Sequence, residues 1–185
     1  MNKLSEAAIG AANIFNTMIP KKLPYQKFLD SFKYAPRPAV NLLVIRENGA
    51  ILLTKRKKPP FAGDWHLPGS FILKGESLMD CVKRVAEEEL GVEIETKIKV
   101  KKVRRLTGLR QRQDVFTLVG VFDDIDGDPR GHVVDLVYQI RPGPASWQAG
   151  PFRPVGDSAE IRFFKKLPQN IGFNHRETLS KLGYL

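Results

Sequence analysis

Residues 68–92, PGSFILKGESLMDCVKRVAEEELGV, contain a glycine-rich turn followed by a segment typical of a helix. Ser77 is a suitable N-cap residue, and Asp80 places negative charge in the first helical turn. Gly91 is a suitable C-terminal cap, because glycine adopts the left-handed conformation without steric cost. The stretch therefore predicts a loop that leads into a helix over residues 78–90.

Acidic residues gather at the end of this predicted helix. At about 100° per residue, positions 85, 88 and 89 share one face, and Arg84 lies one turn before Glu88. Two adjacent carboxylates, Glu88 and Glu89, facing a loop carbonyl would form an oxygen site suited to Mg²⁺ or Mn²⁺. Such a site would hold a diphosphate and polarise a water for attack on phosphorus. The simpler alternative is a solvated acidic helix end.

The same stretch resembles the Nudix box, G-x5-E-x7-R-E-U-x-E-E-x-G-U, in which U is an aliphatic residue. Two positions depart from the pattern: Ser70 stands at the first glycine, and Val85 replaces the glutamate that follows the arginine. The resemblance nevertheless indicates a Nudix hydrolase with a degenerate box. The positions that match are Glu76, Arg84, Glu88, Glu89, Gly91 and Val92.

The resemblance implies a role for each matching residue. Glu89 would be a main metal ligand and Glu88 would also serve the metal, with the carbonyl of Gly69 completing the coordination. Val85 stands where the family usually supplies another carboxylate, which binds metal or acts as a base. Valine can do neither, so the resemblance implies a site for one metal ion and leaves a multi-metal cluster in doubt.

Further catalytic residues follow from the same resemblance. Glu76 would pair with Arg84 and fix the loop against the helix. Because Val85 cannot act as the base, a carboxylate on a late loop is the substitute, and Asp157 and Glu160 are the candidates. The catalytic residues expected from the sequence are thus Glu76, Arg84, Glu88 and Glu89.

Similarity to the family extends outside the box. Residues 61–69, FAGDWHLPG, resemble its W-x-L-P-G lead-in, and residues 127–134, GDPRGHVV, resemble the D-P-R-G segment of ADP-ribose pyrophosphatase-like members and related regulators. Arg130 is a candidate phosphate or ribose ligand, because its guanidinium matches oxyanion geometry, although an exposed turn arginine is the simpler alternative. Trp65 is a candidate for stacking on a base, with a core position as its alternative. Arg56 is the third candidate substrate-binding residue.

The resemblance implies an α/β protein with the Nudix fold, an α/β/α sandwich with a mixed sheet. Residues 1–36 would form an N-terminal helical extension and connector, and residues 37–185 the Nudix domain. Residues 47–49, Glu-Asn-Gly, predict a hairpin between the first two strands. Helices are expected over about 4–18, within 22–34, over 78–90 and near the C-terminus. Strands are expected near 39–45, 50–55, 71–73, 92–105, 114–122, 132–140 and 160–165.

Composition limits the environment and the partners. No apolar run approaches ~20 residues, so no membrane span is expected. Cys81 is the single cysteine, which excludes an intramolecular disulfide and favours a reducing, cytoplasmic location. The net charge of +10 is concentrated in residues 54–58 and 97–105. A solvated edge strand is the default explanation for the second run, and attraction of a polyanion is the functional alternative. A phosphate-rich small molecule explains the positive field as well as nucleic acid does. Nucleic acid is a less favoured partner, and a homodimer is a further option.

Two functional hypotheses follow from the sequence. The first is a Mg²⁺- or Mn²⁺-dependent hydrolase that cleaves a nucleoside diphosphate linked to another group, with ADP-ribose-like compounds as leading substrates. The second is a Nudix module whose catalysis is weakened by Val85 and which acts as a nucleotide sensor or a binding or regulatory protein. We favour the enzyme.

Overall fold

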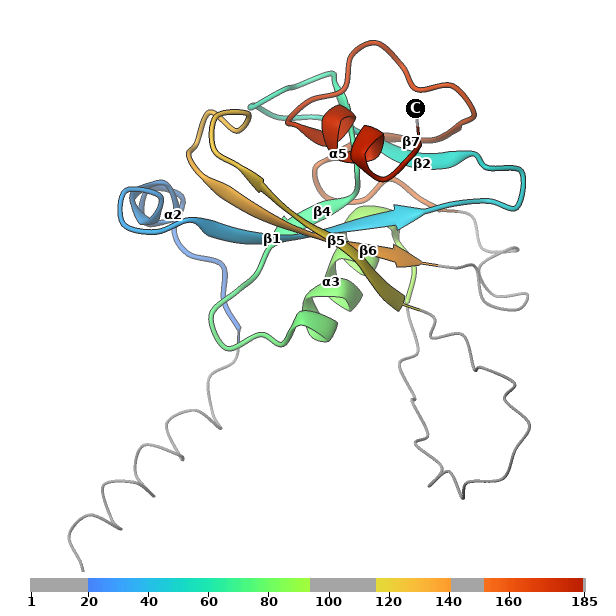
Figure 1. Cartoon of the computed structure of the whole chain (residues 1–185). Helices are drawn as coiled ribbons and strands as arrows, with labels where there is room; N and C mark the ends of the chain where they lie inside the picture. Colours follow the sequence, from blue (N-terminus) through green and yellow to red (C-terminus); the bar gives the residue numbers. More distant parts are fainter. Residues whose placement is uncertain (1–19, 94–115, 141–151, 185) are drawn as a thin grey trace, which may run out of the picture.

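The computed structural model describes residues 20–93, 116–140 and 152–184, which form two β-sheets and three helices (Figure 1). The helices are α2 (Tyr25–Ser31), α3 (Leu78–Leu90) and α5 (His175–Lys181). The first sheet has the order β4-β1-β6-β5, and the second has the order β3-β2-β7. The strands are β1 (Arg37–Val44), β2 (Ile51–Arg56), β3 (Trp65–His66), β4 (Gly69–Phe71), β5 (Phe116–Asp124), β6 (Val133–Ile140) and β7 (Ser158–Phe164).

The strands pair in both directions. β1 runs parallel to β6, whereas β1 with β4 and β5 with β6 are antiparallel. All pairs of the second sheet are antiparallel. The expected mixed sheet is therefore confirmed, as is the α/β class.

The helices cover opposite sides of the strands. Figure 1 shows α3 below the four-stranded sheet and α5 on the other side, next to β2 and β7. Val40, Leu42 and Val44 of β1 pack in the apolar cluster that contains the buried side of α3. Leu43 belongs to a second cluster that contains Leu179 of α5. Both faces of β1 are thus buried, which explains its continuous apolar sequence and confirms the α/β/α arrangement.

Helix α3 begins and ends as its sequence predicts. The hydroxyl of Ser77 accepts a hydrogen bond from the backbone N–H of Asp80 at 3.1 Å, so it caps the first turn. Gly91 follows the last turn with φ of 64°, the left-handed conformation that glycine adopts most readily. The buried side of the helix consists of Cys81, Val82, Val85, Ala86 and Leu90.

Some boundaries differ from the expectation. The turn at residues 47–49 forms, with Gly49 at φ of 78°, but β1 and β2 then diverge into separate sheets and share only a bridge between Ile45 and Ile51. The strand expected at 71–73 instead covers Gly69–Phe71, because it pairs with β1 before the chain turns toward α3. The short strand β3 is not among the strands expected from the sequence. The helix expected over 4–18 and most of the strand expected over 92–105 lie outside the described residues.

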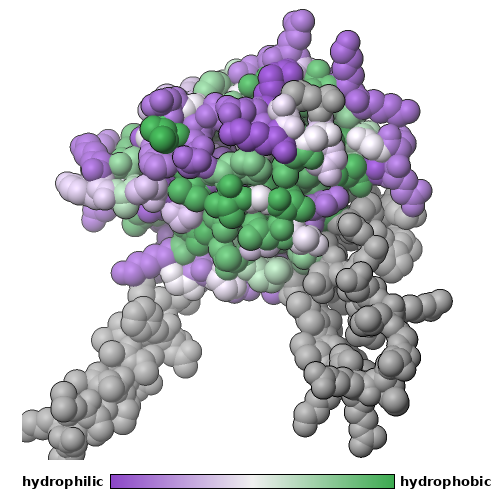
Figure 2. Space-filling view, viewed as in Figure 1, coloured by the Kyte–Doolittle hydropathy of each residue, from purple (hydrophilic) through white to green (hydrophobic). Residues whose placement is uncertain are grey.

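Apolar side chains gather over the middle of one face of the molecule, where β5 runs (Figure 2). Leu118 and Val121 of this strand are exposed. None of the helices in the described part of the chain is long and apolar enough to cross a membrane.

The cap at Ser77 gives a test of helix α3. Ser77→Ala should lower the free energy of unfolding by about 1 kcal/mol, because the N–H of Asp80 loses its acceptor. Ser77→Thr keeps a hydroxyl at this position and should retain most of the stability. Urea unfolding followed by circular dichroism measures both variants. Equal losses in the two variants would show that the hydroxyl is not the stabilising group.

Candidate active site

A cavity of about 180 Å³ lies beside α3 and receives side chains from both sheets. Its lining is strongly charged. The carboxylates that line it are Glu88, Glu89, Asp124, Asp128, Asp135 and Asp157, and the cationic side chains are Lys22, Arg56 and Arg130. Among the described residues, carboxylates therefore outnumber cations two to one in this cavity, which favours the binding of added cations.

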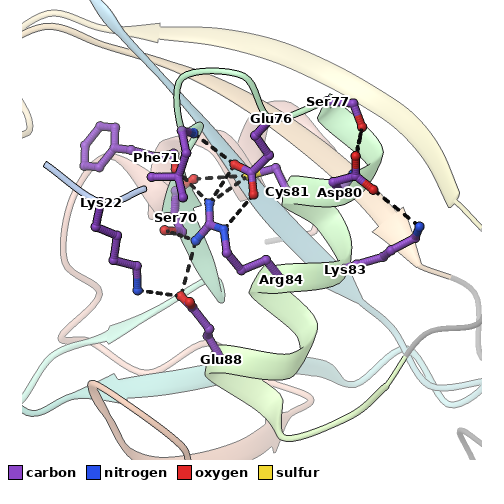
Figure 3. A network of polar contacts seen from close by, with 11 residues as sticks. Lys22, Ser70, Phe71, Glu76, Ser77, Asp80, Cys81, Lys83, Arg84 and Glu88 are labelled. Atoms are coloured by element: carbon purple, nitrogen blue, oxygen red, sulfur yellow. Dashed lines mark hydrogen bonds and ion pairs between the residues drawn. The ribbon is translucent and has the colours of Figure 1, made fainter. Parts of the chain in front are cut away.

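Arg84 connects the loop before α3 to the helix itself (Figure 3). Its Nε donates to Glu76 Oε1 at 2.7 Å, and its Nη2 donates to Glu76 Oε2 at 2.9 Å. The carboxylate also accepts from the N–H of Leu73 at 2.9 Å. Burial acts to raise the pKa of Glu76, but these hydrogen bonds outweigh it, and the pKa lies below its ordinary value. The ion pair expected between Glu76 and Arg84 is present.

Two further contacts of Arg84 explain how the chain accommodates Ser70. The Nη1 group of Arg84 donates to the Ser70 hydroxyl at 3.0 Å, and Nη2 donates to the carbonyl of Phe71 at 3.0 Å. The serine that replaces the first glycine of the box thus adds an acceptor for the guanidinium. Serine at this position of β4 is therefore compatible with the contacts of Arg84.

Glu88 and Glu89 both line the cavity but have different partners. Glu88 Oε2 accepts from Arg84 at 3.2 Å and from Lys22 at 2.8 Å (Figure 3). Glu89 Oε2 accepts from the hydroxyl of Ser158 at 2.5 Å. Burial raises the pKa of Glu89, and the hydrogen bond from Ser158 and the charge of Arg56 offset only part of this effect. A nearby cation would relieve the cost of ionising Glu89 in this position.

The donor set fits a hard divalent cation that also binds substrate. No group of three or more His, Cys, Asp or Glu side chains in the described ranges has the geometry to hold a metal ion. Mg²⁺, however, is usually bound by one or two carboxylates together with waters and substrate phosphates. Glu88 and Glu89 supply two carboxylates, and Gly69 lies in the same cavity wall. These three residues are therefore the candidates for holding Mg²⁺ or Mn²⁺.

Gly69 allows two strands to approach closely at the cavity. A Cβ atom at this position would lie 2.0 Å from Asn41 Oδ1 and 3.0 Å from the carbonyl oxygen of Val40. Only glycine therefore permits this packing without a shift of Asn41. Asn41 Nδ2 in turn donates to Asp135 Oδ1 at 2.7 Å across the parallel pair of β1 and β6.

Two arginines and an aromatic ring form another part of the wall. Arg130 is held by Asp128, with Nε donating to Oδ1 at 2.8 Å and Nη2 to Oδ2 at 2.5 Å. Arg56 Nε donates to the carbonyl of Pro60 at 2.7 Å, and no described carboxylate is within ion-pair distance of its guanidinium. The guanidinium carbons lie over the ring of Phe173, at 5.2 Å for Arg56 and 5.4 Å for Arg130. Arg56 is consequently the cation better placed to accept a phosphate.

Two histidines that line the cavity are neutral. Burial lowers the pKa of His66 well below its ordinary value, and it lowers the pKa of His175 to about 4. His66 Nδ1 donates to the carbonyl of Leu67 at 2.6 Å, and His175 Nδ1 accepts from the N–H of Leu67 at 3.0 Å. The two imidazoles therefore fix the connection between β3 and β4 that contains Leu67, rather than adding positive charge.

Two positions differ from the sequence expectation. Trp65 is 5% exposed, packs against Phe164 at 4.7 Å and does not line the cavity, so it is a core residue rather than a stacking platform. Val85 is fully buried in the apolar cluster below the helix and does not share the cavity face of Glu88 and Glu89. This difference arises because the side chain at 85 points toward the sheet.

The two candidate bases lie in different places. Asp157 lines the cavity, and its ion pair with Lys58 at 2.8 Å lowers its pKa. Glu160 does not line the cavity and is paired with Arg162 on β7. Position alone therefore favours Asp157.

Several residues of the cavity wall cannot be predicted from the sequence. Asn41, Asp124, Asp135, Phe173 and His175 come from distant segments and carry no local spacing signal. A signal was available for Asp135, because it is a single acidic residue within the otherwise apolar strand VVDLVYQI. An acidic side chain in a buried strand needs a partner or a function.

The pKa of Asp135 predicts a pH-dependent stability. Burial raises this pKa from 3.8 to about 7, against the hydrogen bond from Asn41 and together with the charges of Asp124 and Asp128. Because folding raises the pKa, the stability that protonation contributes is complete below the ordinary pKa and is lost as the pH rises through about 7. Asp135→Asn removes this loss. The quantity to compare is the free energy of unfolding of the variant minus that of the native chain. This difference should be about 2 kcal/mol larger at pH 8 than at pH 5.

Urea unfolding at the two pH values measures this difference, with the exposed Asp126→Asn as the matched control. A stability difference that is the same at pH 5 and pH 8 would contradict the assigned titration.

Comparison with known proteins places this architecture in a family. The sequence profile described as NUDIX domain matches residues 35–169. The chain is 31% identical over 174 residues to the ADP-ribose pyrophosphatase of Methanocaldococcus jannaschii, and the alignment covers 92% of this chain and 88% of that protein.

Solved structures agree with this assignment. The MutT NUDIX hydrolase from Burkholderia pseudomallei is similar with a TM-score of 0.59 and 29% identity, covering 79% of this chain and 97% of that one. The NUDIX domain of Shewanella oneidensis NrtR complexed with ADP ribose is similar in fold, with a TM-score of 0.55 at 17% identity, covering 86% of this chain and 96% of that one. From its helix, its cavity and these matches, we conclude that the chain belongs to the NUDIX domain family.

Proposed function

We propose that the chain is a Mg²⁺- or Mn²⁺-dependent hydrolase that cleaves the pyrophosphate of a nucleoside diphosphate linked to another group. ADP-ribose-like compounds are the leading substrates. The observation that carries the proposal is that Glu88 and Glu89 line the same cavity as Arg56 and Arg130. Similarity to an ADP-ribose pyrophosphatase over 92% of the chain supports it.

The cations of the cavity suit a diphosphate. Arg56 has no carboxylate partner among the described residues, so its amino groups are available to a phosphate oxygen. The charge of Arg130 is already neutralised by Asp128. Arg130 therefore offers a ligand hydrogen-bond donors in a fixed position, but no unpaired positive charge. A divalent ion between Glu88, Glu89 and the substrate would neutralise phosphate charge and activate water for attack.

The remaining residues hold the metal-ligand candidates in place and accept the proton of the attacking water. Arg84 binds Ser70, which follows Gly69 in β4, and Glu76 in the next loop, and these contacts hold the candidate metal ligands of strand and helix in register. In the reaction, a water oxygen forms a bond to one phosphorus, and the bridging P–O bond breaks. Asp157 is the candidate acceptor for the proton of that water, because it lines the cavity. Its ion pair with Lys58 lowers its pKa, which makes it a weaker base.

The role of Glu89 is the first test of this proposal. The assay separates by chromatography the nucleotide products formed with Mg²⁺ or Mn²⁺ from ADP-ribose, nucleotide sugars, dinucleoside polyphosphates and nucleoside triphosphates. We expect turnover of the ADP-ribose class. Glu89→Gln should lower the rate by at least on the order of 100-fold and weaken metal activation, because a metal ligand contributes several kcal/mol to catalysis.

Glu87→Gln is the matched control, since Glu87 is exposed on the same helix and does not line the cavity. It should retain the native rate. Unchanged turnover in Glu89→Gln, with native thermal stability, would exclude the proposed site.

A specific observation supports a second candidate function, a nucleotide-binding module with weak or no catalysis. Val85 occupies the position of a glutamate in the Nudix box, and its side chain is fully buried in the apolar cluster. Two carboxylates, rather than three, are therefore offered by α3 to the cavity. If none of the assayed substrates is turned over and a nucleotide ligand raises the thermal stability, the result would favour this function.

Val85→Glu distinguishes an impaired enzyme from an adapted one. The new carboxylate should lower the free energy of unfolding by about 1–3 kcal/mol, because it replaces a fully buried apolar side chain. If the site lacks this ligand, turnover should nevertheless rise by roughly tenfold or more, equivalent to about 1.4 kcal/mol of barrier. Val85→Gln is the control, with similar size but no charge. A rate that stays at the native level in both folded variants would show that the missing glutamate does not limit activity.

A further inference from the structure

Three of the buried residues that line the cavity are acidic. Asp124, Asp128 and Asp135 are each no more than 5% exposed. Asp124 Oδ1 accepts from the N–H of Gly127 at 2.6 Å and from the side-chain amide of Asn174. Asp128 is paired with Arg130. These contacts leave Asp135 as the acid with the fewest partners.

Asp135 has one oxygen engaged and one available. Its Oδ1 accepts from Asn41 Nδ2 at 2.7 Å, whereas its Oδ2 receives no hydrogen bond from any described residue. Asn41 is itself only 4% exposed, so the orientation of the carboxyl group is fixed. Oδ2 is not among the buried side-chain atoms that lack a partner, so it is accessible from the cavity that Asp135 lines. A ligand that donates a hydrogen bond to this oxygen would therefore be bound favourably.

The surrounding charges restrict the type of ligand group. Negative phosphate would be repelled by Asp124 and Asp135, while Arg56 offers it a better position in the same cavity. A flat base would need an uncovered aromatic ring. Phe71 and Phe173, however, already lie under guanidinium groups, at 4.9 Å from Arg130 to Phe71 and 5.2 Å from Arg56 to Phe173. A neutral, non-aromatic group that donates hydrogen bonds remains.

The size of the cavity also favours a neutral group that donates hydrogen bonds. The cavity volume of about 180 Å³ is below the roughly 300–1,000 Å³ of sites that enclose a drug-sized ligand. A whole nucleoside diphosphate derivative therefore cannot be enclosed, and only a terminal part of it enters. The terminal part that is neutral, compact and rich in hydroxyl donors is a sugar ring.

We propose that Asp135, oriented by Asn41, binds a hydroxyl group of the sugar at the non-nucleoside end of the diphosphate. This inference rests on the proposed function, and it assigns the enclosed end of the substrate to a sugar phosphate. Asp135 thereby acts as a specificity-determining residue, because a substrate without these hydroxyls leaves its Oδ2 unpaired.

A hydroxyl group suits this carboxyl in either protonation state. Burial raises the pKa of Asp135 to about 7, so both states are populated near neutral pH. A hydroxyl can donate to the ionised form and accept from the protonated form. The Asp124 and Asp128 carboxylates, the Arg130 guanidinium and Asn41 are the charged or polar groups that act on this pKa.

Titration calorimetry with product-like probes tests the assignment without requiring turnover. Ribose 5-phosphate and inorganic phosphate are titrated into the native chain, Asp135→Ala and the exposed control Asp126→Ala, with Mg²⁺ present. The native chain and the control should bind ribose 5-phosphate at least on the order of tenfold more tightly than phosphate, as expected for a hydrogen bond to a charged group. Asp135→Ala should remove this preference and leave phosphate binding unchanged.

A second set of titrations identifies the sugar and the group. Asp135→Asn keeps an acceptor oxygen and should retain part of the preference. AMP should bind equally to the native chain and to Asp135→Ala, because the proposal assigns the other sugar to this site. Loss of AMP binding in Asp135→Ala, or the absence of a preference for ribose 5-phosphate in the native chain, would overturn the proposal. A sugar preference without hydrolysis would instead refute the proposed reaction alone, and hydrolysis without an effect of Asp135 would refute this inference alone.

Discussion

The guanidinium of Arg84 is the interaction on which the geometry of the cavity depends. It binds Glu76 in the loop, the Ser70 hydroxyl in β4 and Glu88 one turn later in α3. A guanidinium presents its donors in a fixed planar fork, so these contacts determine the position of the loop relative to the helix. β4 also pairs with β1, which carries Asn41 and, through it, orients Asp135. One side chain thus links the metal-ligand candidates to the opposite wall of the cavity.

This arrangement favours a defined site over maximal stability. Ion pairs that are withdrawn from water gain little net stability, because desolvation of both partners opposes their attraction. The pair of Arg84 and Glu76 is largely withdrawn, with side-chain exposures of 16% and 3%. The raised pKa values of Glu89 and Asp135 show that other carboxylates of the cavity are also held at a cost. Such shifted groups in a concave site are typical of functional positions.

The sequence predicts the parts of this structure that depend on neighbours along the chain. The cap at Ser77, the left-handed Gly91 and the ion pair of Glu76 with Arg84 all lie within one segment, where helical periodicity gives the spacing. The direction of a side chain relative to the sheets is different. The positions of Val85 and Trp65 depend on which strands pack against them, and that information lies in distant residues.

The opposite wall of the cavity is difficult to predict for the same reason. Asn41 and Asp135 are 94 residues apart and meet only because β1 and β6 pair in parallel. Likewise, the N–H of Leu67 reaches His175 across 108 residues. Without the strand order, neither pair has a recognisable motif. A motif therefore locates the candidate metal ligands, while the fold is needed to locate the opposite wall of the cavity.

The environment of Cys81 has a practical consequence for chemical work on this protein. Its thiol is fully buried beneath the Arg84 network, and burial together with the charge of Glu76 raises its pKa to about 12. Alkylating reagents and oxidants react with the thiolate, which is scarcely populated here at neutral pH. A cysteine introduced on the surface would therefore take up a maleimide probe selectively, with the native sulfur left in place.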